Sequence, residues 1–218
     1  MRDAWNPAKF LPALWWVLAA ACSPAAEPVT VEIVFDGCGA AFAGSVAGVV
    51  IGPELAVTVA HGVIQGDRFR VDGGAASVVA LDRRSDLALL EVPGMEVRDV
   101  TLASTETGAH VTVVGGLVNQ IADARVVATP TIRIEEVLGT RRVERAGLEL
   151  QAPLEEGDSG AGVFDDRKRM VGVVFAVNDE RDGTAWAVSS REVETLLAGD
   201  RTAWVCDPAE STLRRDQP

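Results

Sequence analysis

Three short segments of the chain carry side chains that could together perform acyl transfer. His61 closes the run TVAH at residues 58–61, Asp86 opens an apolar stretch, and Ser159 lies in GDSG at residues 157–160. A serine hydroxyl is a weak nucleophile at neutral pH and needs a base within hydrogen-bond reach. A histidine can take that proton and return it to a leaving amine, while a buried carboxylate holds the imidazole in the required tautomer. We therefore interpret Ser159 as a nucleophile, His61 as its general base and Asp86 as the residue that orients the base.

The glycines that flank Ser159 predict a loop that binds an oxyanion. Without a side chain, glycine adopts backbone conformations in which neighbouring N–H groups point into one concavity. The expected donors are the backbone N–H groups of Gly157 and Ser159. Where one such donor has been removed from an enzyme, the transition state lost about 3–4 kcal/mol of stabilisation.

The segments that must position these residues have the pattern of many short strands. Apolar runs of strand length alternate with turns at glycine, proline and aspartate, as at Asp72-Gly73-Gly74. This pattern predicts an all-β sandwich or barrel. The expected strands are residues 46–51, 55–59, 68–71, 75–81, 87–92, 111–114, 124–131, 148–152, 161–164, 171–177 and 184–188.

A single helix is predicted near the C-terminal end. Ser189, followed three residues later by Glu192, matches a capping box with Ser189 as the N-cap. Apolar residues then recur at helical spacing, and Gly199 is a typical residue to end a helix. The polar residues 207–218 are expected to form a frayed tail.

The order histidine, aspartate, serine with these flanks resembles the chymotrypsin-like (trypsin-fold) serine peptidases. Residues 58–61 are similar to that family's Thr-Ala-Ala-His, and residues 157–160 match its Gly-Asp-Ser-Gly. The segment VVALDRRSDLALL at residues 78–90 is especially similar to bacterial Deg/HtrA-type protease domains, here without a PDZ domain. The resemblance spans residues 40–190.

The resemblance implies an all-β fold of two packed six-stranded antiparallel β-barrels with a short C-terminal helix. The protease domain would occupy residues 31–206. Within it, the first barrel would lie at about 31–95, the second at about 108–190 and the helix at about 190–198.

The resemblance also implies where the site lies and what it does. His61 and Asp86 would belong to the first barrel and Ser159 to the second, with the active site in the cleft between them. The implied protein is a serine endopeptidase that acts on proteins or peptides and needs no cofactor. Two alternatives remain open: a catalytically silent module that binds a peptide or partner in the cleft, and a serine esterase that uses the same triad. The absence of a G-x-S-x-G motif argues against an α/β-hydrolase.

The primary substrate pocket of the family would involve five residues of this chain. Its floor would fall at Pro153 and Leu154, just before the nucleophile, and its opposite wall at Val174, Phe175 and Ala176. An aspartate on the floor would select lysine or arginine, and none is present there. We therefore expect an apolar pocket for a small or medium-sized aliphatic side chain.

Three acidic residues stand close to the nucleophile in the sequence. Glu155 and Glu156 could attract basic residues of a substrate at the pocket rim. Asp158 would pair with a new N-terminus in family members that are activated by clipping. No Ile-Val-Gly-Gly segment that could supply such a terminus is visible, so activation by clipping is not expected.

The N-terminal segment predicts export. Residues 1–21 contain an apolar, uncharged run that suits the core of a signal peptide and is too short to span a membrane. The small residues before Cys22 resemble a bacterial lipobox, in which case this cysteine carries a lipid anchor on the periplasmic side or at the outer membrane. Ordinary cleavage after Ala21 or Ala26, which would leave a soluble exported protein, is the alternative. A short spacer would occupy residues 22–30.

The number of cysteines favours one disulfide bridge. If Cys22 carries lipid, Cys38 and Cys206 remain, and an exported compartment permits them to pair. The bridge would join the first strand region to the C-terminal end of the domain. Two buried free thiols are the alternative.

Composition and charge exclude several classes of partner. The 218 residues are 48% hydrophobic and 24% charged, as in globular proteins. The net charge of -12 argues against nucleic acid or an anionic lipid surface as a partner, so membrane contact is expected only through Cys22. Two histidines and three cysteines, with no CxxC or HExxH motif, predict no metal site.

Overall fold

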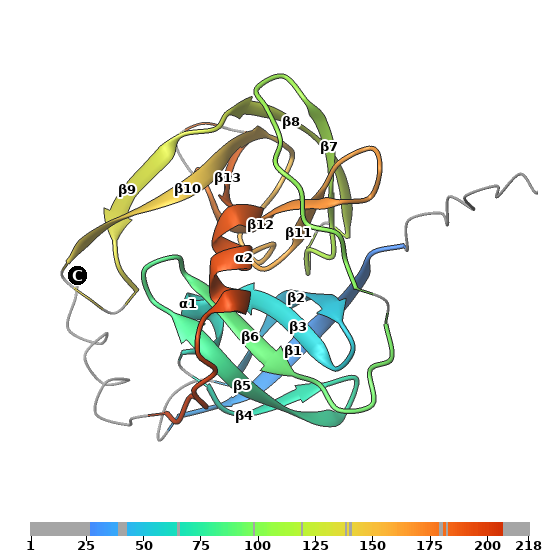
Figure 1. The fold of residues 1–218 in the computed structure, drawn as a ribbon, viewed down its shortest axis with the longest axis vertical. Coiled ribbons are helices and arrows are strands. Elements are labelled where there is room, and N and C mark those ends of the chain that lie inside the picture. Colours follow the sequence, from blue (N-terminus) through green and yellow to red (C-terminus); the bar gives the residue numbers. More distant parts are fainter. Residues whose placement is uncertain are drawn as a thin grey trace, which may run out of the picture.

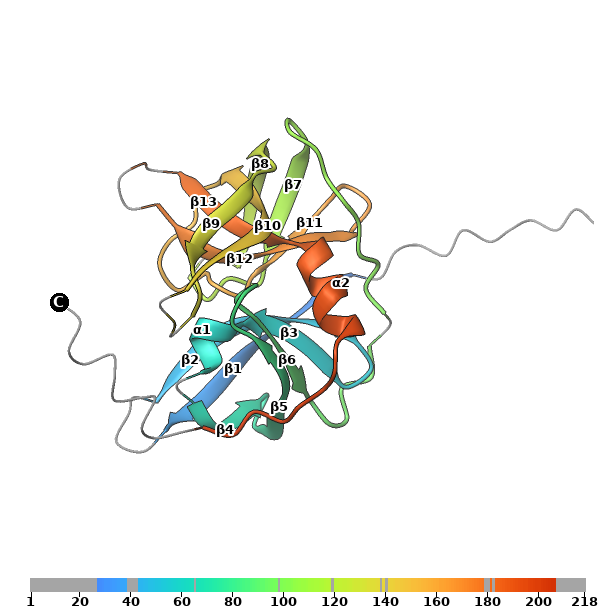
Figure 2. The same cartoon turned by 60° about the vertical axis from the view of Figure 1, so that its left-hand side comes forward.

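The structure places two β-barrels side by side, one built from each half of the chain (Figures 1 and 2). The segments 1–26, which hold the predicted signal and Cys22, and 207–218, the predicted tail, lie outside the described residues. The computed structural model describes residues 27–38, 43–64, 66–97, 99–118, 120–137, 139, 141–178, 181 and 183–206.

The first barrel is built from six antiparallel strands. They are β1 (Val29–Gly37), β2 (Gly44–Gly52), β3 (Leu55–Val59), β4 (Gly66–Val71), β5 (Gly74–Asp82) and β6 (Leu87–Glu91). Their order around the barrel is β1-β2-β3-β6-β5-β4, and β1 closes it by pairing with both β2 and β4. The turn predicted at Asp72-Gly73 joins β4 to β5, with Val71 opposite Gly74.

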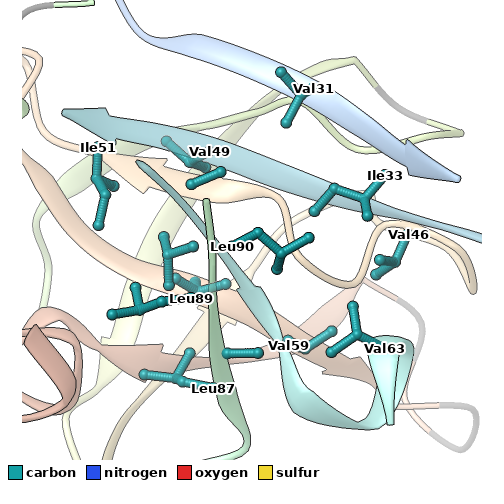
Figure 3. Close-up of a cluster of buried hydrophobic side chains, with 14 of the residues drawn as sticks. Val31, Ile33, Val46, Val49, Ile51, Val59, Val63, Leu87, Leu89 and Leu90 are labelled. Carbon is teal, nitrogen blue, oxygen red and sulfur yellow. The ribbon is translucent and has the colours of Figure 1, made fainter. Parts of the chain in front are cut away.

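Apolar residues fill this barrel in two different patterns. In β1 the side chains of Val31, Ile33 and Phe35 are buried and alternate with exposed residues, as expected for a strand with one face on the core. In contrast, β6 buries four consecutive residues, LALL, and besides its strand neighbours it contacts the helix α2 (Ser190–Ala198). Figure 3 shows side chains from several strands, among them Val59 and Leu90, gathered in this core.

The second barrel uses the remaining strands. They are β7 (His110–Val114), β8 (Ile121–Ala128), β9 (Thr131–Glu135), β10 (Arg142–Gln151), β11 (Gly162–Phe164), β12 (Met170–Val177) and β13 (Thr184–Ser189). The order is β13-β12-β11-β7-β8-β10, and the pairing of β13 with β10 closes this ring of six. The additional strand β9 pairs with the first half of β10. The predicted fold class of two six-stranded antiparallel barrels with a C-terminal helix is confirmed.

The single strand predicted at residues 124–131 is wrong, because two strands share that segment. β8 ends at Ala128 and β9 begins at Thr131. Pro130 lies between them and has no N–H to donate to a strand ladder, while its carbonyl accepts a hydrogen bond from the Gly147 amide at 3.0 Å. The sequence here reads Thr129-Pro130-Thr131, so the proline was a local signal of the break that the predicted strand ran across.

The helix α2 begins as predicted but uses its acidic residue differently. The Ser189 side chain is the N-cap and accepts from the Arg191 amide. The Glu192 carboxylate does not close a capping box; it accepts from the Ala146 amide of β10 at 2.8 Å and from Arg84, at the turn that follows β5. Figures 1 and 2 show α2 along the junction of the barrels, where it contacts strands of both. No helix among the described residues is long and apolar enough to cross a membrane.

The segment after α2 returns to the first barrel and is tied there. Cys206 forms a disulfide with Cys38 at the end of β1, with the two Cα atoms 6.1 Å apart, which confirms the predicted pairing. The Trp204 amide also donates to the Val78 carbonyl of β5 at 3.0 Å. A bridge that closes so long a loop is worth about 2–4 kcal/mol in the usual range. The segment after α2 is therefore fixed to the first barrel by a disulfide and by a backbone hydrogen bond.

Candidate active site

The short helix α1 (Ala60–Val63) positions His61. It follows β3 directly, and the Ala60 amide donates to the Asp86 carbonyl at 3.0 Å. The histidine side chain is about one-third exposed, at 32%. Part of the side chain is thus accessible, while the backbone is held against the start of β6.

Asp86 makes two hydrogen bonds to this histidine. One carboxylate oxygen, Oδ1, accepts from the His61 backbone amide at 2.9 Å, and the other, Oδ2, lies 2.8 Å from His61 Nδ1. Because the ionised carboxylate can only accept, Nδ1 carries the proton in this pair and Nε2 is left as the acceptor of the neutral ring. That tautomer is the one a general base requires.

The turn that carries Asp86 is strained and well supported. Asp86 has a φ of 60°, in the left-handed region, and its side chain is buried. The preceding Asp82 carboxylate accepts from the amides of Arg84 and Ser85 and from the Ser85 hydroxyl. Such strain persists where surrounding contacts over-determine the backbone, and it concentrates at functional sites.

Ser159 lies on a loop of the second barrel that touches the first. Gly160 has a φ of +94°, and a Cβ at this position would come within 1.9 Å of the Ala47 carbonyl oxygen of β2. The Gly160 amide donates to the Val174 carbonyl of β12 at 2.8 Å. A residue with a side chain could not follow this path, so glycine allows the loop to reach the opposite barrel.

Asp158, beside the serine, fastens the loop from within. Its buried carboxylate accepts from the Val118 amide at 2.9 Å and from the Glu155 amide at 3.1 Å. The first donor belongs to the connection between β7 and β8, and the second to the loop itself. Asp158 therefore joins the serine loop to the connection between β7 and β8.

A cavity of about 580 Å³ at the junction of the barrels brings these parts together. His61 and Ser159 both line it, together with Gly157, Phe35 of β1 and Phe175 of β12. The Ser159 hydroxyl donates to the Phe175 carbonyl at 3.2 Å. The three residues singled out in the sequence thus meet at one cleft, with Asp86 buried behind His61.

A sequence model of the trypsin-like peptidase domain matches residues 46–173 of the chain. The chain belongs to the trypsin-like peptidase family. The matched segment contains the TVAH and GDSG motifs and the Asp86 turn, so the family assignment and the cleft rest on the same residues.

Curated and solved relatives of this trypsin-like chain agree with the fold. The serine protease Rv3671c of Mycobacterium tuberculosis is 30% identical over an alignment of 166 residues that covers 69% of this chain and 41% of that protein. The chain thus spans about two-fifths of the length of that relative. The crystal structure of the active form of the Rv3671c protease has a TM-score of 0.74 at 22% identity and covers 94% of this chain and 98% of that one. The HtrA-type protease AlgW with a tripeptide has a TM-score of 0.66 at 19% identity, over 79% of this chain and 60% of that chain.

The oxyanion donors predicted for this trypsin-like domain lie at the cavity. Gly157, with a φ of +104°, and Ser159 both line it. The alternate amides of the loop face protein instead, since Asp158 donates to the Glu155 carbonyl at 3.1 Å and Gly160 to Val174. Alternation of this kind leaves the amides of Gly157 and Ser159 as the loop's candidates for an oxyanion.

The five residues predicted to form the substrate pocket divide in the structure. Phe175 and Ala176 line the cavity. Leu154 packs into the core of the second barrel, Val174 is fully buried there, and Pro153 is exposed outside the cavity lining. Glu155, Glu156 and Val177, which are not among these five, also line the cavity.

One buried charge lies beside the site and was not predicted from the sequence. Arg145 of β10 is 3% exposed and lies 3.8 Å from Asp86 Oδ2. A signal existed: residue 145 falls on the buried face of an alternating strand, where a charge requires a partner. Which residue would be that partner depends on how the barrels dock, and no local pattern contains that information.

Proposed function

We propose that this member of the trypsin-like family is an exported serine endopeptidase that uses Ser159, His61 and Asp86. The proposal rests on two observations. Asp86 accepts hydrogen bonds from both the His61 amide and Nδ1, and His61 and Ser159 line one cavity between the barrels. A silent binding module has no chemical need for that arrangement. A general base does, because its tautomer decides whether it can accept a proton.

The proposed reaction begins with a rotation of the Ser159 hydroxyl. It leaves the Phe175 carbonyl and donates to His61 Nε2; hydrogen bonds of this kind often tighten only when substrate is bound. As Oγ attacks the scissile carbonyl carbon, its proton passes to Nε2, and the resulting imidazolium is stabilised by Asp86. The amides of Gly157 and Ser159 donate to the oxyanion of the tetrahedral intermediate.

Collapse of that intermediate completes the first half of the reaction. The C–N bond breaks, His61 gives its proton to the leaving amine, and the acyl group remains as an ester on Ser159. Water then enters, gives a proton to His61 and attacks the ester carbon. The proton returns to Oγ as the carboxylic acid product departs, so the enzyme is restored.

The cavity supports a preference for peptides with an aliphatic side chain before the cleaved bond. Phe175, Ala176 and Val177 offer apolar surface on the wall formed by β12. Glu155 and Glu156 are exposed at the rim, where a basic residue elsewhere in the substrate would be favoured. Cleavage of a peptide library tests this, since exclusive cleavage after lysine or arginine would contradict an apolar primary pocket.

The proposed export rests on two independent features. A disulfide such as Cys38–Cys206 is typical of an oxidising compartment, and the first residues have the composition of a signal peptide. We further propose that Cys22 is lipidated. Metabolic labelling with a fatty-acid analogue should mark the wild type and not Cys22→Ser, whereas an unlabelled wild type would indicate a soluble exported protein.

A fluorophosphonate probe tests the catalytic proposal directly. The wild type should be labelled and Ser159→Ala should not, while Ser104→Ala, at an exposed serine outside the cavity lining, should be labelled like the wild type. A folded wild type that takes no label would refute an active serine enzyme and favour the silent module. Hydrolysis of small esters without any cleavage of the peptide library would favour the esterase.

A further inference from the structure

Arg145 contacts two parts of the candidate site, although it belongs to none of the recognised motifs. It lies in β10 of the second barrel and is almost fully buried. Its Nη1 donates to the Ser85 carbonyl at 3.0 Å, in the turn of the first barrel that carries Asp86. Its guanidinium also stacks 4.0 Å from the centre of the Phe175 ring, and Phe175 is the residue whose carbonyl accepts from Ser159.

The positive charge of Arg145 lies next to one particular oxygen of Asp86. Nη1 lies 3.8 Å from Oδ2, the same carboxylate oxygen that accepts from His61 Nδ1. An unopposed carboxylate favours the protonated imidazole beside it, because opposite charges stabilise each other. A fixed cation at the same oxygen offsets part of that effect. Since a protonated His61 cannot accept the Ser159 proton, the cation bears directly on the first step of the proposed reaction.

Burying a charged guanidinium costs free energy. That cost would not be needed if residue 145 only joined the two barrels. Desolvation lowers the pKa of Arg145, and the nearby carboxylates of Asp86, Glu192 and Asp82 oppose that shift, while Arg84 adds to it. The guanidinium remains charged, because arginine does not lose its proton in proteins. Its Nε has no hydrogen-bond partner among the residues that the structure describes. The contacts thus anchor one end of the side chain, and that end faces Asp86.

We propose that Arg145 is a positioning residue that holds Asp86 against His61 and, through its charge, extends the activity of the peptidase toward lower pH. The proposal rests on the proposed function, since it concerns the same His61–Asp86 pair. The charged groups that face this pair and the guanidinium are Asp86 and His61 themselves, Asp82 and Arg84 on the adjacent turn, and Glu192 on α2. Substitution of Arg145 alone leaves the others in place.

The test compares the pH dependence of the rate of fluorophosphonate inactivation between variants of Arg145. Arg145→Met and Arg145→Gln remove the charge, while Arg145→Lys keeps it. We expect the acid limb of the rate profile to move to higher pH by about 0.5–1 unit in both neutral variants. Below the limb this is a loss of about three- to tenfold relative to wild type, and the lysine variant should keep its limb close to that of the wild type.

A matched control shows that the loss of one positive charge is not itself the cause. Arg133 lies on the neighbouring strand β9, is exposed, and pairs with Glu144 at 2.7 Å. Arg133→Met should therefore leave the acid limb in place. Far-UV circular dichroism and thermal melts establish that each variant is folded before its profile is compared.

Two results would overturn the proposal without touching the proposed function. One is a labelled wild type together with folded neutral variants that lose rate equally at every pH, which indicates that Arg145 is a structural bridge only.

If neither neutral variant folds, a crystal structure of the phosphonylated wild type tests the proposal and can give the second result. A guanidinium within about 4 Å of Asp86 Oδ2 supports the proposal, and one more than about 6 Å away removes its basis. A wild type that takes no label at all would instead refute the proposed function.

Discussion

The two barrels contribute to the candidate site in different ways. The first holds His61 and Asp86 in a finished arrangement, with both carboxylate oxygens engaged and the histidine tautomer set. The second supplies Ser159 on a loop whose hydroxyl is hydrogen-bonded to a backbone carbonyl, at 3.2 Å from Phe175. The direct hydrogen bonds to the proposed base thus come from its own barrel, and the second barrel adds Arg145 behind Asp86. The nucleophile depends on a glycine, a buried aspartate and the contact between the barrels.

The largest expected effect comes from a change in the His61–Asp86 pair of the first barrel, the proposed general base. Asp86→Asn would place an amide donor against Nδ1, which favours the tautomer with its proton on Nε2 and removes the acceptor for Ser159. The rate of fluorophosphonate inactivation should fall roughly ten-thousand-fold. Thermal stability should also fall, because buried Arg145 loses its nearest carboxylate. Asp123→Asn, at an exposed position of β8, is the control and should match the wild type. A small effect of Asp86→Asn would mean that another group sets the tautomer.

In the loop that carries Ser159, the proposed nucleophile, we expect substitution of Gly160 to have the largest effect on activity. Gly160→Ala places a Cβ against the Ala47 carbonyl in a left-handed conformation. We expect the loop to move, with a loss of inactivation rate of about a hundredfold or more and a fall in the free energy of unfolding of about 2 kcal/mol or more.

A control separates strain from collision in that experiment. Gly73 has a φ of +80° but nothing within 4 Å of its would-be Cβ. Gly73→Ala should lose about 1 kcal/mol of stability through backbone strain and keep the wild-type rate. Equal rates for the two glycine variants would contradict the idea that the Ala47 contact shapes the serine loop.

A smaller loss is expected when the internal fastening of the loop is weakened. Asp158→Asn keeps one acceptor oxygen but turns an amide donor toward the Val118 or Glu155 amide. We expect about a tenfold lower inactivation rate and a loss of about 1–2 kcal/mol in chemical denaturation. An unchanged rate would show that the loop keeps its shape without the carboxylate.

The smallest expected effect concerns an ion pair at the edge of the first barrel. The pKa of Asp36 lies below its ordinary value of 3.8, first because Arg70 donates hydrogen bonds to it and also because the charges of Arg70 and Arg68 favour the carboxylate. Its contribution to stability is present above the unfolded pKa and is lost as the pH falls through the lower folded value. Urea unfolding between about pH 5 and pH 2 should therefore show a shallower loss of stability in Asp36→Asn than in the wild type. Parallel curves would mean that the pair is worth nothing in solution.

The sequence could predict the parts of this site whose chemistry restricts the residue type. A histidine at the end of an apolar strand, an aspartate at the start of the next buried strand and a serine among glycines each keep a local signature. The hairpin at Asp72 likewise follows from a local pattern. The expected strands did not include β1, although its buried and exposed residues alternate. Pro130 was a local signal of the break between β8 and β9 that the expected strand at 124–131 ran across. No local pattern revealed that Glu192 contacts Ala146 and Arg84.

By itself the sequence determined the family, the two-barrel fold and the three residues that we propose to be catalytic. It also contained the two cysteines that pair. Only the tertiary structure decided that Leu154 and Val174 enter a core while Glu155 and Val177 bound the cavity. Only the docking of the barrels placed Arg145 against Asp86. The physical reason is that hydrogen-bonded strands are specified by patterns of neighbouring residues, whereas contacts between barrels join residues far apart in the chain.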